Sequence, residues 1–149
     1  MRIFVHCADP REEADLDSKI SKWFVTPGER VVKLSLFGGP ICLVFDQFQG
    51  KAQELIKDIC FAIDNRQKFG AAPDEEVEVV LVGHTCQFYS QIGTHPSRRD
   101  QELHLADAIG QLQQKLDFRY DFPVIVSGHF DITVGENIAF EEVVPLVNA

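Results

Sequence analysis

Lysine and arginine are scarce in this chain of 149 residues, where 14 of them stand against 23 aspartates and glutamates, for a formal net charge of −9. Nucleic acids and anionic membranes are held by clustered basic side chains. The one close basic pair, Arg98-Arg99, is followed at once by Asp100. No apolar run approaches the roughly 18 residues that cross a bilayer. We therefore expect neither a nucleic acid nor a membrane as a partner.

Cysteine is scarce as well, and its four copies do not make a disulfide framework. We expect Cys7, Cys42, Cys60 and Cys86 to be thiols or metal ligands in a reducing compartment. The first residues become polar too soon for a signal peptide, which predicts a cytoplasmic protein. The sequence has no internal repeat, low-complexity tract or Gly/Ser linker, so residues 1–149 are interpreted as one domain with a buried core.

Short apolar runs alternate with amphipathic stretches along the chain. The runs predict strands over 2–7, 31–37, 77–82 and 123–127, and the amphipathic stretches predict helices over 12–24, 50–69 and 101–116. Near-continuous apolar strands are buried on both faces, and helical connections make them parallel. We predict an α/β fold: a three-layer sandwich whose central, mainly parallel sheet has the order 2-1-3-4 and is flanked by helices. The tail, over 138–147, is a candidate for an extra edge strand.

Several residues with binding chemistry follow the ends of the predicted strands, namely Cys7, Gly38-Gly39, His84 and His129. In open parallel sheets, ligands bind beyond the carboxyl ends of the strands, at the point where the strand order reverses. With the order 2-1-3-4, this point lies between the first and third strands. Cys7 and His84 would then face one crevice.

A thiol, a carboxylate and a guanidinium follow the first strand in the segment Cys7-Ala8-Asp9-Pro10-Arg11. Thiolates bind zinc or attack electrophiles, and a nearby arginine can hold an aspartate ionised and fix its direction. Taken alone, the segment is equally a strand-end cysteine followed by a solvated turn. A cysteine-phosphatase loop is excluded, because that loop has five residues between its cysteine and arginine, whereas Cys7 and Arg11 are separated by three, one of them acidic.

His84 and Cys86 add a nitrogen and a sulfur donor after the third strand. Together with Cys7 they would supply three protein ligands and leave one replaceable position, which is typical of a catalytic zinc site. Asp9, two residues after Cys7, is a candidate for a further ligand, and His129 at the end of the fourth predicted strand is the best alternative ligand. Taken alone, the two residues have a simpler interpretation, in which His84 caps a loop at the end of a strand and Cys86 is a small buried thiol.

The remaining histidines and cysteines have simpler interpretations. His6 alternates with Cys7 and is predicted to be a packed or hydrogen-bonded core histidine. Cys42 and Cys60 lie in apolar surroundings and are predicted to be small buried hydrophobic residues. His104, near the first turn of the third predicted helix, is expected to be exposed.

In this order, the segments resemble those of the β-class carbonic anhydrases. The features that match are Cys7-x-Asp9-x-Arg11, the Gly38-Gly39 turn, Gly83-His84-Thr85 with Cys86, and a last strand that runs into residues 128–135. The resemblance covers most of the chain. It implies a zinc enzyme that interconverts carbon dioxide and bicarbonate, because Zn²⁺ lowers the pKa of water to about 7. By the same resemblance, Cys7, His84 and Cys86 would hold the metal, Asp9 and Arg11 would control its fourth position, and the protein would be a homodimer or higher homo-oligomer.

The sequence departs from the family pattern at two places. The family has two residues between its histidine and cysteine, whereas only Thr85 separates His84 from Cys86, and Leu36-Phe37 replaces polar residues before the glycine turn. Side chains at i and i+2 of an extended strand are too far apart to share one zinc ion, so a shared site requires a bend at Thr85. Two further hypotheses are a non-catalytic protein that binds a small ligand or metal, or acts through oligomer contacts, on the same fold, and an enzyme with Cys7 as its nucleophile.

Overall fold

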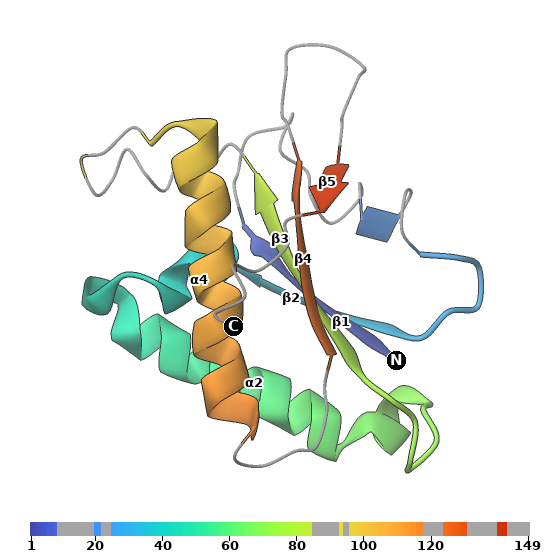
Figure 1. The fold of residues 1–149 in the computed structure, drawn as a ribbon. Helices are drawn as coiled ribbons and strands as arrows, with labels where there is room; N and C mark the ends of the chain where they lie inside the picture. The colour runs from blue at the N-terminus through green and yellow to red at the C-terminus, as the bar shows by residue number, and fades with distance from the viewer. Residues whose placement is uncertain are drawn as a thin grey trace.

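The computed structural model describes residues 1–8, 20–21, 25–84, 93, 96–117, 124–130 and 140–142 (Figure 1). Its strands are β1 (Arg2–Cys7), β2 (Val31–Leu36), β3 (Glu78–His84), β4 (Val124–Phe130) and β5 (Phe140–Glu142). Its α-helices are α2 (Gln49–Asp64) and α4 (Arg98–Asp117), and its short 3-10 helices are η2 (Gly39–Leu43), η3 (Asp46–Phe48) and η4 (Arg66–Phe69).

The strands form one sheet in the order β2-β1-β3-β4-β5. β1 pairs in parallel with both β2 and β3, β3 pairs in parallel with β4, and β5 runs antiparallel along β4. Helical connections allow the parallel arrangement, because α2 separates β2 from β3 and α4 separates β3 from β4 along the chain. The prediction of an α/β domain built on a parallel sheet with helical crossovers is confirmed.

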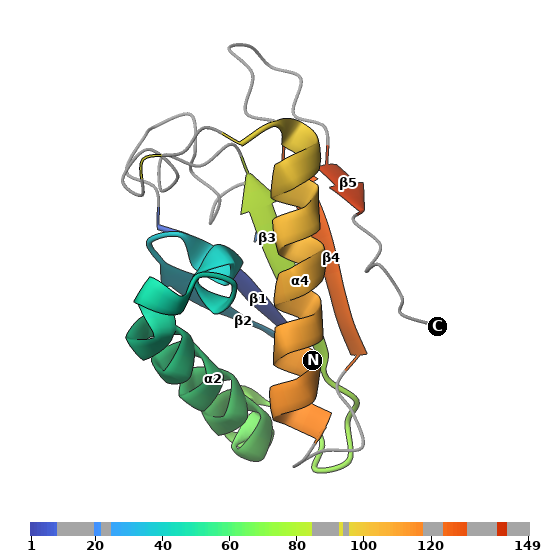
Figure 2. The same ribbon diagram turned by 60° about the vertical axis from the view of Figure 1, so that its left-hand side comes forward.

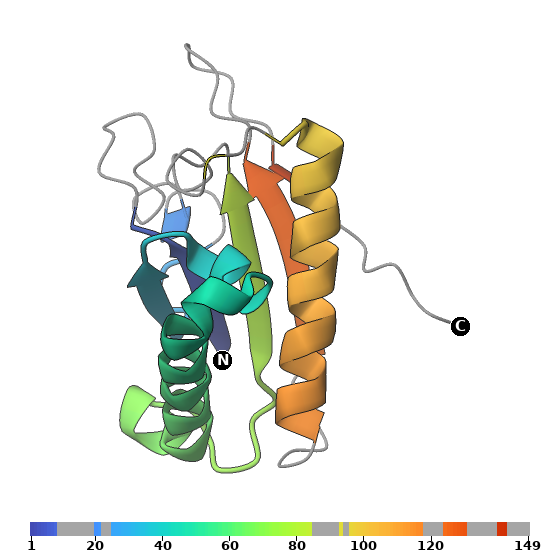
Figure 3. The same ribbon diagram turned by 90° about the vertical axis from the view of Figure 1, so that its left-hand side faces the viewer.

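One face of the sheet is covered by α2 and α4, which Figures 2 and 3 show on the same side of the strands. Apolar side chains of both helices pack against this face and form the main core. Its members, each at most 3% exposed, include Ile3, Val5, Leu55, Ile59, Ile63, Val79, Leu81, Ile109, Leu112 and Leu116. The strand residues of this core alternate with residues that belong to the other face, as the pleat of a strand requires.

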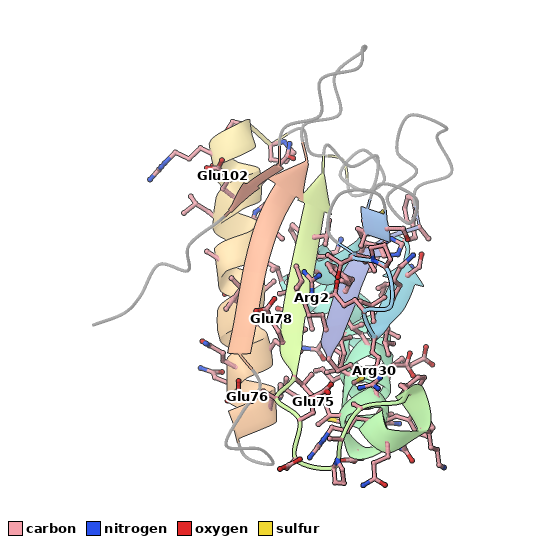
Figure 4. The ribbon with its side chains drawn as sticks, turned by 90° about the vertical axis from the view of Figure 1, so that its right-hand side faces the viewer. Arg2, Arg30, Glu75, Glu76, Glu78 and Glu102 are labelled. Carbon is pink, nitrogen blue, oxygen red and sulfur yellow. The ribbon has the colours of Figure 1, made fainter. Side chains whose placement is uncertain are left out.

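A second apolar cluster joins Phe4, Val80 and Val82, which belong to the other face of the sheet, to residues at the end of β1 and in η2. Its buried members are Phe4, Cys7, Ile20, Ile41, Cys42, Val80 and Val82. Figure 4 views this face, with the strands in front of both helices. The helix predicted over 12–24, which would form the third layer, lies outside the described residues except for Ile20 and Ser21, which are helical. The three-layer arrangement therefore stays a prediction.

The structure ends α2 earlier than the predicted helix over 50–69, because the chain continues after Asn65 as the separate 3-10 helix η4. Asn65 itself helps to end α2, since its Nδ2 donates a hydrogen bond to the Phe61 carbonyl oxygen at 2.8 Å. Gly70 then ends η4 with a φ of 88°, the left-handed conformation that favours glycine at such a position. The predicted capping role of Gly70 is confirmed, although it caps η4.

The structure starts α4 at Arg98, before the predicted range 101–116, because Ser97 caps it. Ser97 Oγ accepts a hydrogen bond from the Asp100 N–H at 3.2 Å, as expected of an N-cap residue. Asp100 in the first turn and Lys115 in the last turn complement the helix dipole. Among the described helices, none combines the length and the hydrophobicity that a membrane span requires.

A glycine turn brings the exit of β2 against the end of β1. Gly38 and Gly39 both have positive φ angles, of 90° and 55°, which L side chains rarely adopt. A Cβ added to Gly39 would lie 2.8 Å from Cys7 N and 2.9 Å from the His6 carbonyl carbon, well inside van der Waals contact. The sequence predicts only a tight exit here and misses the two 3-10 helices, η2 and η3, that follow.

Ion pairs connect segments at the amino-terminal edge of the strands (Figure 4). Arg2 on β1 pairs with Glu29, and Arg30 Nη1 lies 3.6 Å from Glu75 Oε1. Partial burial raises the pKa of Glu29, but the Thr26 N–H bond at 2.9 Å and the Arg2 guanidinium outweigh it, so that the pKa lies below its ordinary value. A lowered pKa means that ionised Glu29 stabilises the fold above its unfolded-state pKa and loses this effect as the pH falls.

Replacing Gly39 with alanine tests the close approach of the glycine turn to β1. We expect Gly39→Ala to lower the free energy of unfolding by about 2 kcal/mol or more, because the new Cβ meets backbone atoms and the residue must keep its positive φ. Urea unfolding measures the change. Gly110→Ala in α4 is the matched control, since its Cβ would meet nothing within 4 Å. Equal stability of Gly39→Ala and the parent would contradict the contact.

Replacing Glu29 with glutamine tests the ion pair at the opposite edge. We expect Glu29→Gln to lower the free energy of unfolding by up to about 1 kcal/mol at neutral pH, with an effect that shrinks as the pH falls below about 4. Urea midpoints measured across this pH range give the comparison, and Glu54→Gln at an exposed position of α2 is the control. A Glu29→Gln penalty that does not change with pH would argue against the pairing.

Candidate functional site

The pairing of the strands opens the sheet between β1 and β3 at its carboxyl-terminal edge. The β1–β3 pairing runs from Arg2–Glu78 to Val5–Leu81. On the outer sides, β1 stays paired with β2 as far as Cys7, and β3 stays paired with β4 as far as His84. The chain passes from β1 to β2 on one side of the opening and from β3 to β4 on the other side. The opening is therefore the topological switch point, which is where open parallel sheets bind ligands.

Cys7 ends β1 at one side of this opening, and its side chain is held by the glycine turn. The residue is only 2% exposed, and its Sγ accepts a hydrogen bond from the Gly38 N–H at 3.1 Å. Hydrogen bonds donated to a sulfur favour its charged form. Donors of this kind also surround thiolates that ligate metals, where they orient the ligand and tune the metal. The Gly38 N–H therefore gives the Cys7 sulfur a fixed donor, as the sulfur of a metal ligand often has.

His6 holds the backbone of Cys7 from the neighbouring position. Its Nδ1 lies 3.0 Å from the Cys7 carbonyl oxygen, and since a carbonyl only accepts, Nδ1 carries the proton. The imidazole is 3% exposed, which confirms the prediction of a hydrogen-bonded core histidine. Cys7 is thus fixed at two atoms, by Gly38 at its sulfur and by His6 at its carbonyl oxygen.

Cys42, in η2, differs from Cys7 although both thiols are buried. Its Sγ donates a hydrogen bond to the Phe37 carbonyl oxygen at 3.3 Å. Burial raises the pKa of the Cys42 thiol to about 11, with the nearby Lys51 opposing this shift and Cys7 adding to it. Cys42 therefore keeps its proton at neutral pH. The predicted burial is confirmed, at 1% exposure, while the hydrogen bond to Phe37 adds a role that the sequence does not indicate.

The other predicted ligands are placed only in part. His84 is the last residue of β3 and pairs with Phe130, and His129 on β4 pairs with Gly83, so the two histidines lie on adjacent strands one register position apart. Asp9, Arg11 and Cys86 lie outside the described residues. Within the described part of the chain, no group of three or more His, Cys, Asp or Glu side chains could hold a metal ion. The backbone therefore brings the ends of β1 and β3 to one edge, and the complete ligand set stays a prediction.

A separate cavity of about 230 Å³ lies between the η2–η3 segment, α2 and α4. Phe45 and Ile56 contribute apolar lining, Asp46 and Lys115 contribute charges of opposite sign, and Cys42 also lines it. The His104 ring lies edge-on to Phe45, with 5.2 Å between the ring centroids. His104 is thus half-buried by this contact, which corrects the expectation that it is exposed.

The sequence does not predict the contacts that the glycine turn makes with Cys7 and Cys42. The available signal is Gly38-Gly39-Pro40, because a proline at the first position after glycine is typical of a helix start and predicts a helical turn that carries the following cysteine. Comparison of the chain with protein-family models, with curated proteins and with solved structures finds no match. A function therefore has to be inferred from the residues of this chain.

Proposed function

We propose that this chain is a cytoplasmic zinc enzyme, similar to the β-class carbonic anhydrases, that interconverts carbon dioxide and bicarbonate. The observation that carries the proposal is the position of Cys7. Its sulfur accepts the Gly38 N–H at 3.1 Å, at the end of a strand that borders the opening of the sheet. A backbone donor to the sulfur, at the edge where α/β sheets bind their ligands, supports a ligating role for Cys7.

The proposed ligands are Cys7 on one side of the opening and His84 with Cys86 on the other. Cysteine sulfur and histidine nitrogen are the donors that zinc prefers, and a fourth, replaceable position makes the site catalytic. Bound zinc would supply the Lewis acidity that makes hydroxide available from water near neutral pH. The contacts of Cys7 fit this role, because the Gly38 N–H would stabilise the charge of a metal-bound thiolate and His6 fixes the backbone of Cys7.

Asp9 and Arg11 would control access to the fourth position. An arginine that pairs with Asp9 holds this carboxylate away from the metal and leaves the position free for water. With zinc bound, the metal would supply the hydroxide that converts carbon dioxide to bicarbonate, and Asp9 and Arg11 would keep its fourth position open. We further propose that a helix over 12–24 completes a three-layer sandwich around the parallel order β2-β1-β3-β4, and that the protein is a homodimer or higher homo-oligomer.

A second candidate is a non-catalytic protein that uses the same opening for a small ligand or metal. One observation favours it: β3 stays extended and paired through His84. Residues i and i+2 of an extended chain are about 6.6 Å apart, whereas two donors on one zinc ion lie roughly 4 Å apart or less. His84 and Cys86 can share a metal only if the chain bends directly after β3, at Thr85.

Metal content separates the two candidates. Protein purified without added metal should contain about one zinc ion per chain by elemental analysis, and Cys7→Ser should lose it with the fold retained, because the buried sheet does not depend on the thiol at its edge. Cys60→Ser is the matched control, since Cys60 is also a buried cysteine but lies on α2 in the main core. Zinc content unchanged in Cys7→Ser would show that the site is elsewhere.

Carbon dioxide hydration by the zinc-loaded protein is the direct test of activity. Measurable hydration that disappears in Cys7→Ser but not in Cys60→Ser supports the enzyme. Zinc at about one per chain without hydration leaves the non-catalytic metal-binding protein. Absence of zinc, with rapid alkylation of Cys7 by a small electrophile, supports the remaining hypothesis of a cysteine nucleophile.

Arg11→Ala tests the proposed Asp9–Arg11 dyad. Without the guanidinium, Asp9 is free to occupy the fourth position on zinc, so we expect zinc content to stay at the parent level while hydration at neutral pH falls. Arg11→Lys is the conservative comparison, because lysine keeps the charge but cannot form the bidentate pair with a carboxylate. Parent-level hydration in Arg11→Ala at neutral pH would count against the dyad.

A further inference from the structure

We propose that Cys42 is a positioning residue for the metal-binding sulfur of Cys7, and that it acts through the peptide group between Phe37 and Gly38. The inference rests on the proposed function, because it assigns Cys42 a role in the same site. The sequence resemblance gives Cys42 no role, and its own position in an apolar stretch predicts only a small buried residue.

The two cysteines hold opposite ends of one peptide group. Cys42 Sγ donates its proton to the Phe37 carbonyl oxygen at 3.3 Å, and the N–H of the same peptide, on Gly38, donates to Cys7 Sγ at 3.1 Å. In a trans peptide the C=O and N–H bonds point to opposite sides. The contact with Cys42 therefore directs the carbonyl away from Cys7 and keeps the N–H directed at it.

This orientation needs an anchor because the turn is built from glycines. Rotation of the Phe37–Gly38 peptide changes ψ of Phe37 and φ of Gly38, and Gly38 has no Cβ to restrict its φ, so this residue does little to oppose the rotation. Rotation would turn the Phe37 carbonyl toward Cys7 and replace a donor with an oxygen that repels a thiolate. The close approach of Gly39 to the backbone of His6 and Cys7 fixes the position of the turn, and Cys42 fixes the direction of the peptide.

The hydrogen bond also assigns different chemistry to the two thiols. A carbonyl oxygen only accepts, so Cys42 donates its proton to Phe37, whereas the Cys7 sulfur accepts the Gly38 N–H and has no acceptor for a proton at this peptide. Cys42 thus supports the ligand without being one. Groups that orient a ligand from outside the metal's own shell change metal affinity by about 10- to 100-fold when they are removed.

Cys42→Ala and Cys42→Ser test the proposal against zinc. Alanine removes the donor, so we expect zinc affinity, measured in competition with a coloured chelator, to fall by about 10- to 100-fold. Serine keeps a hydroxyl donor at the same place and should restore affinity to within a few-fold of the parent. Cys60→Ala, another buried cysteine to alanine change, should leave affinity unchanged. Parent-like affinity in Cys42→Ala, or an equal loss in both Cys42 variants, would overturn the proposal.

Hydrogen exchange of the Gly38 amide in metal-free protein tests the same anchor without zinc. We expect faster exchange in Cys42→Ala than in the parent or in Cys42→Ser, with the exchange of β3 amides unchanged. If the parent binds no zinc, the proposed function fails, and this exchange pattern still decides whether Cys42 orients the peptide. Unchanged protection of Gly38 in Cys42→Ala would overturn the positioning role whatever the metal result.

Discussion

The contact between the Gly38-Gly39 turn and the end of β1 is the constraint on which the carboxyl-terminal edge of the sheet depends. Gly39 lies so close to the backbone of His6 and Cys7 that a side chain cannot be placed there. This contact brings the Gly38 N–H to the Cys7 sulfur and lets the chain continue directly into η2, where Cys42 reaches back to the same turn. One local backbone geometry therefore sets the surroundings of both thiols.

The opening between β1 and β3 follows from the strand order and not from any single residue. Each central strand has a parallel neighbour on both sides near its start, but beyond Val5 and Leu81 β1 remains with β2 and β3 with β4. Helices α2 and α4 cover one face of the sheet and form the main core with it, whereas the residues with binding chemistry lie at the ends of the strands.

Apolar periodicity predicts most of the described fold because burial on both faces of a sheet leaves a strong mark on a sequence. The strands near residues 2, 31, 78 and 124 and the two long helices are found where the runs and stripes predict them, with ends shifted by a few residues. The shifts have local causes, such as the Ser97 cap of α4 and the Asn65 hydrogen bond that ends α2. The helices η2 and η3 carry no such periodicity, since each is too short to form an apolar stripe.

The candidate site is predicted less completely, because sequence spacing gives residue types but not the direction of a thiol or a peptide. Cys7 and Cys42 are both buried cysteines, and the sequence separates them only by the strand end and the charged residues that adjoin Cys7. In the structure, the separation comes from the two ends of the Phe37–Gly38 peptide, one an acceptor and the other a donor. A cysteine that faces an N–H is suited to carry negative charge, and a cysteine that faces a C=O is not. If zinc binds at this edge, the peptide therefore favours Cys7 as its ligand, and the path that the chain takes after His84 decides how many more ligands can reach the same ion.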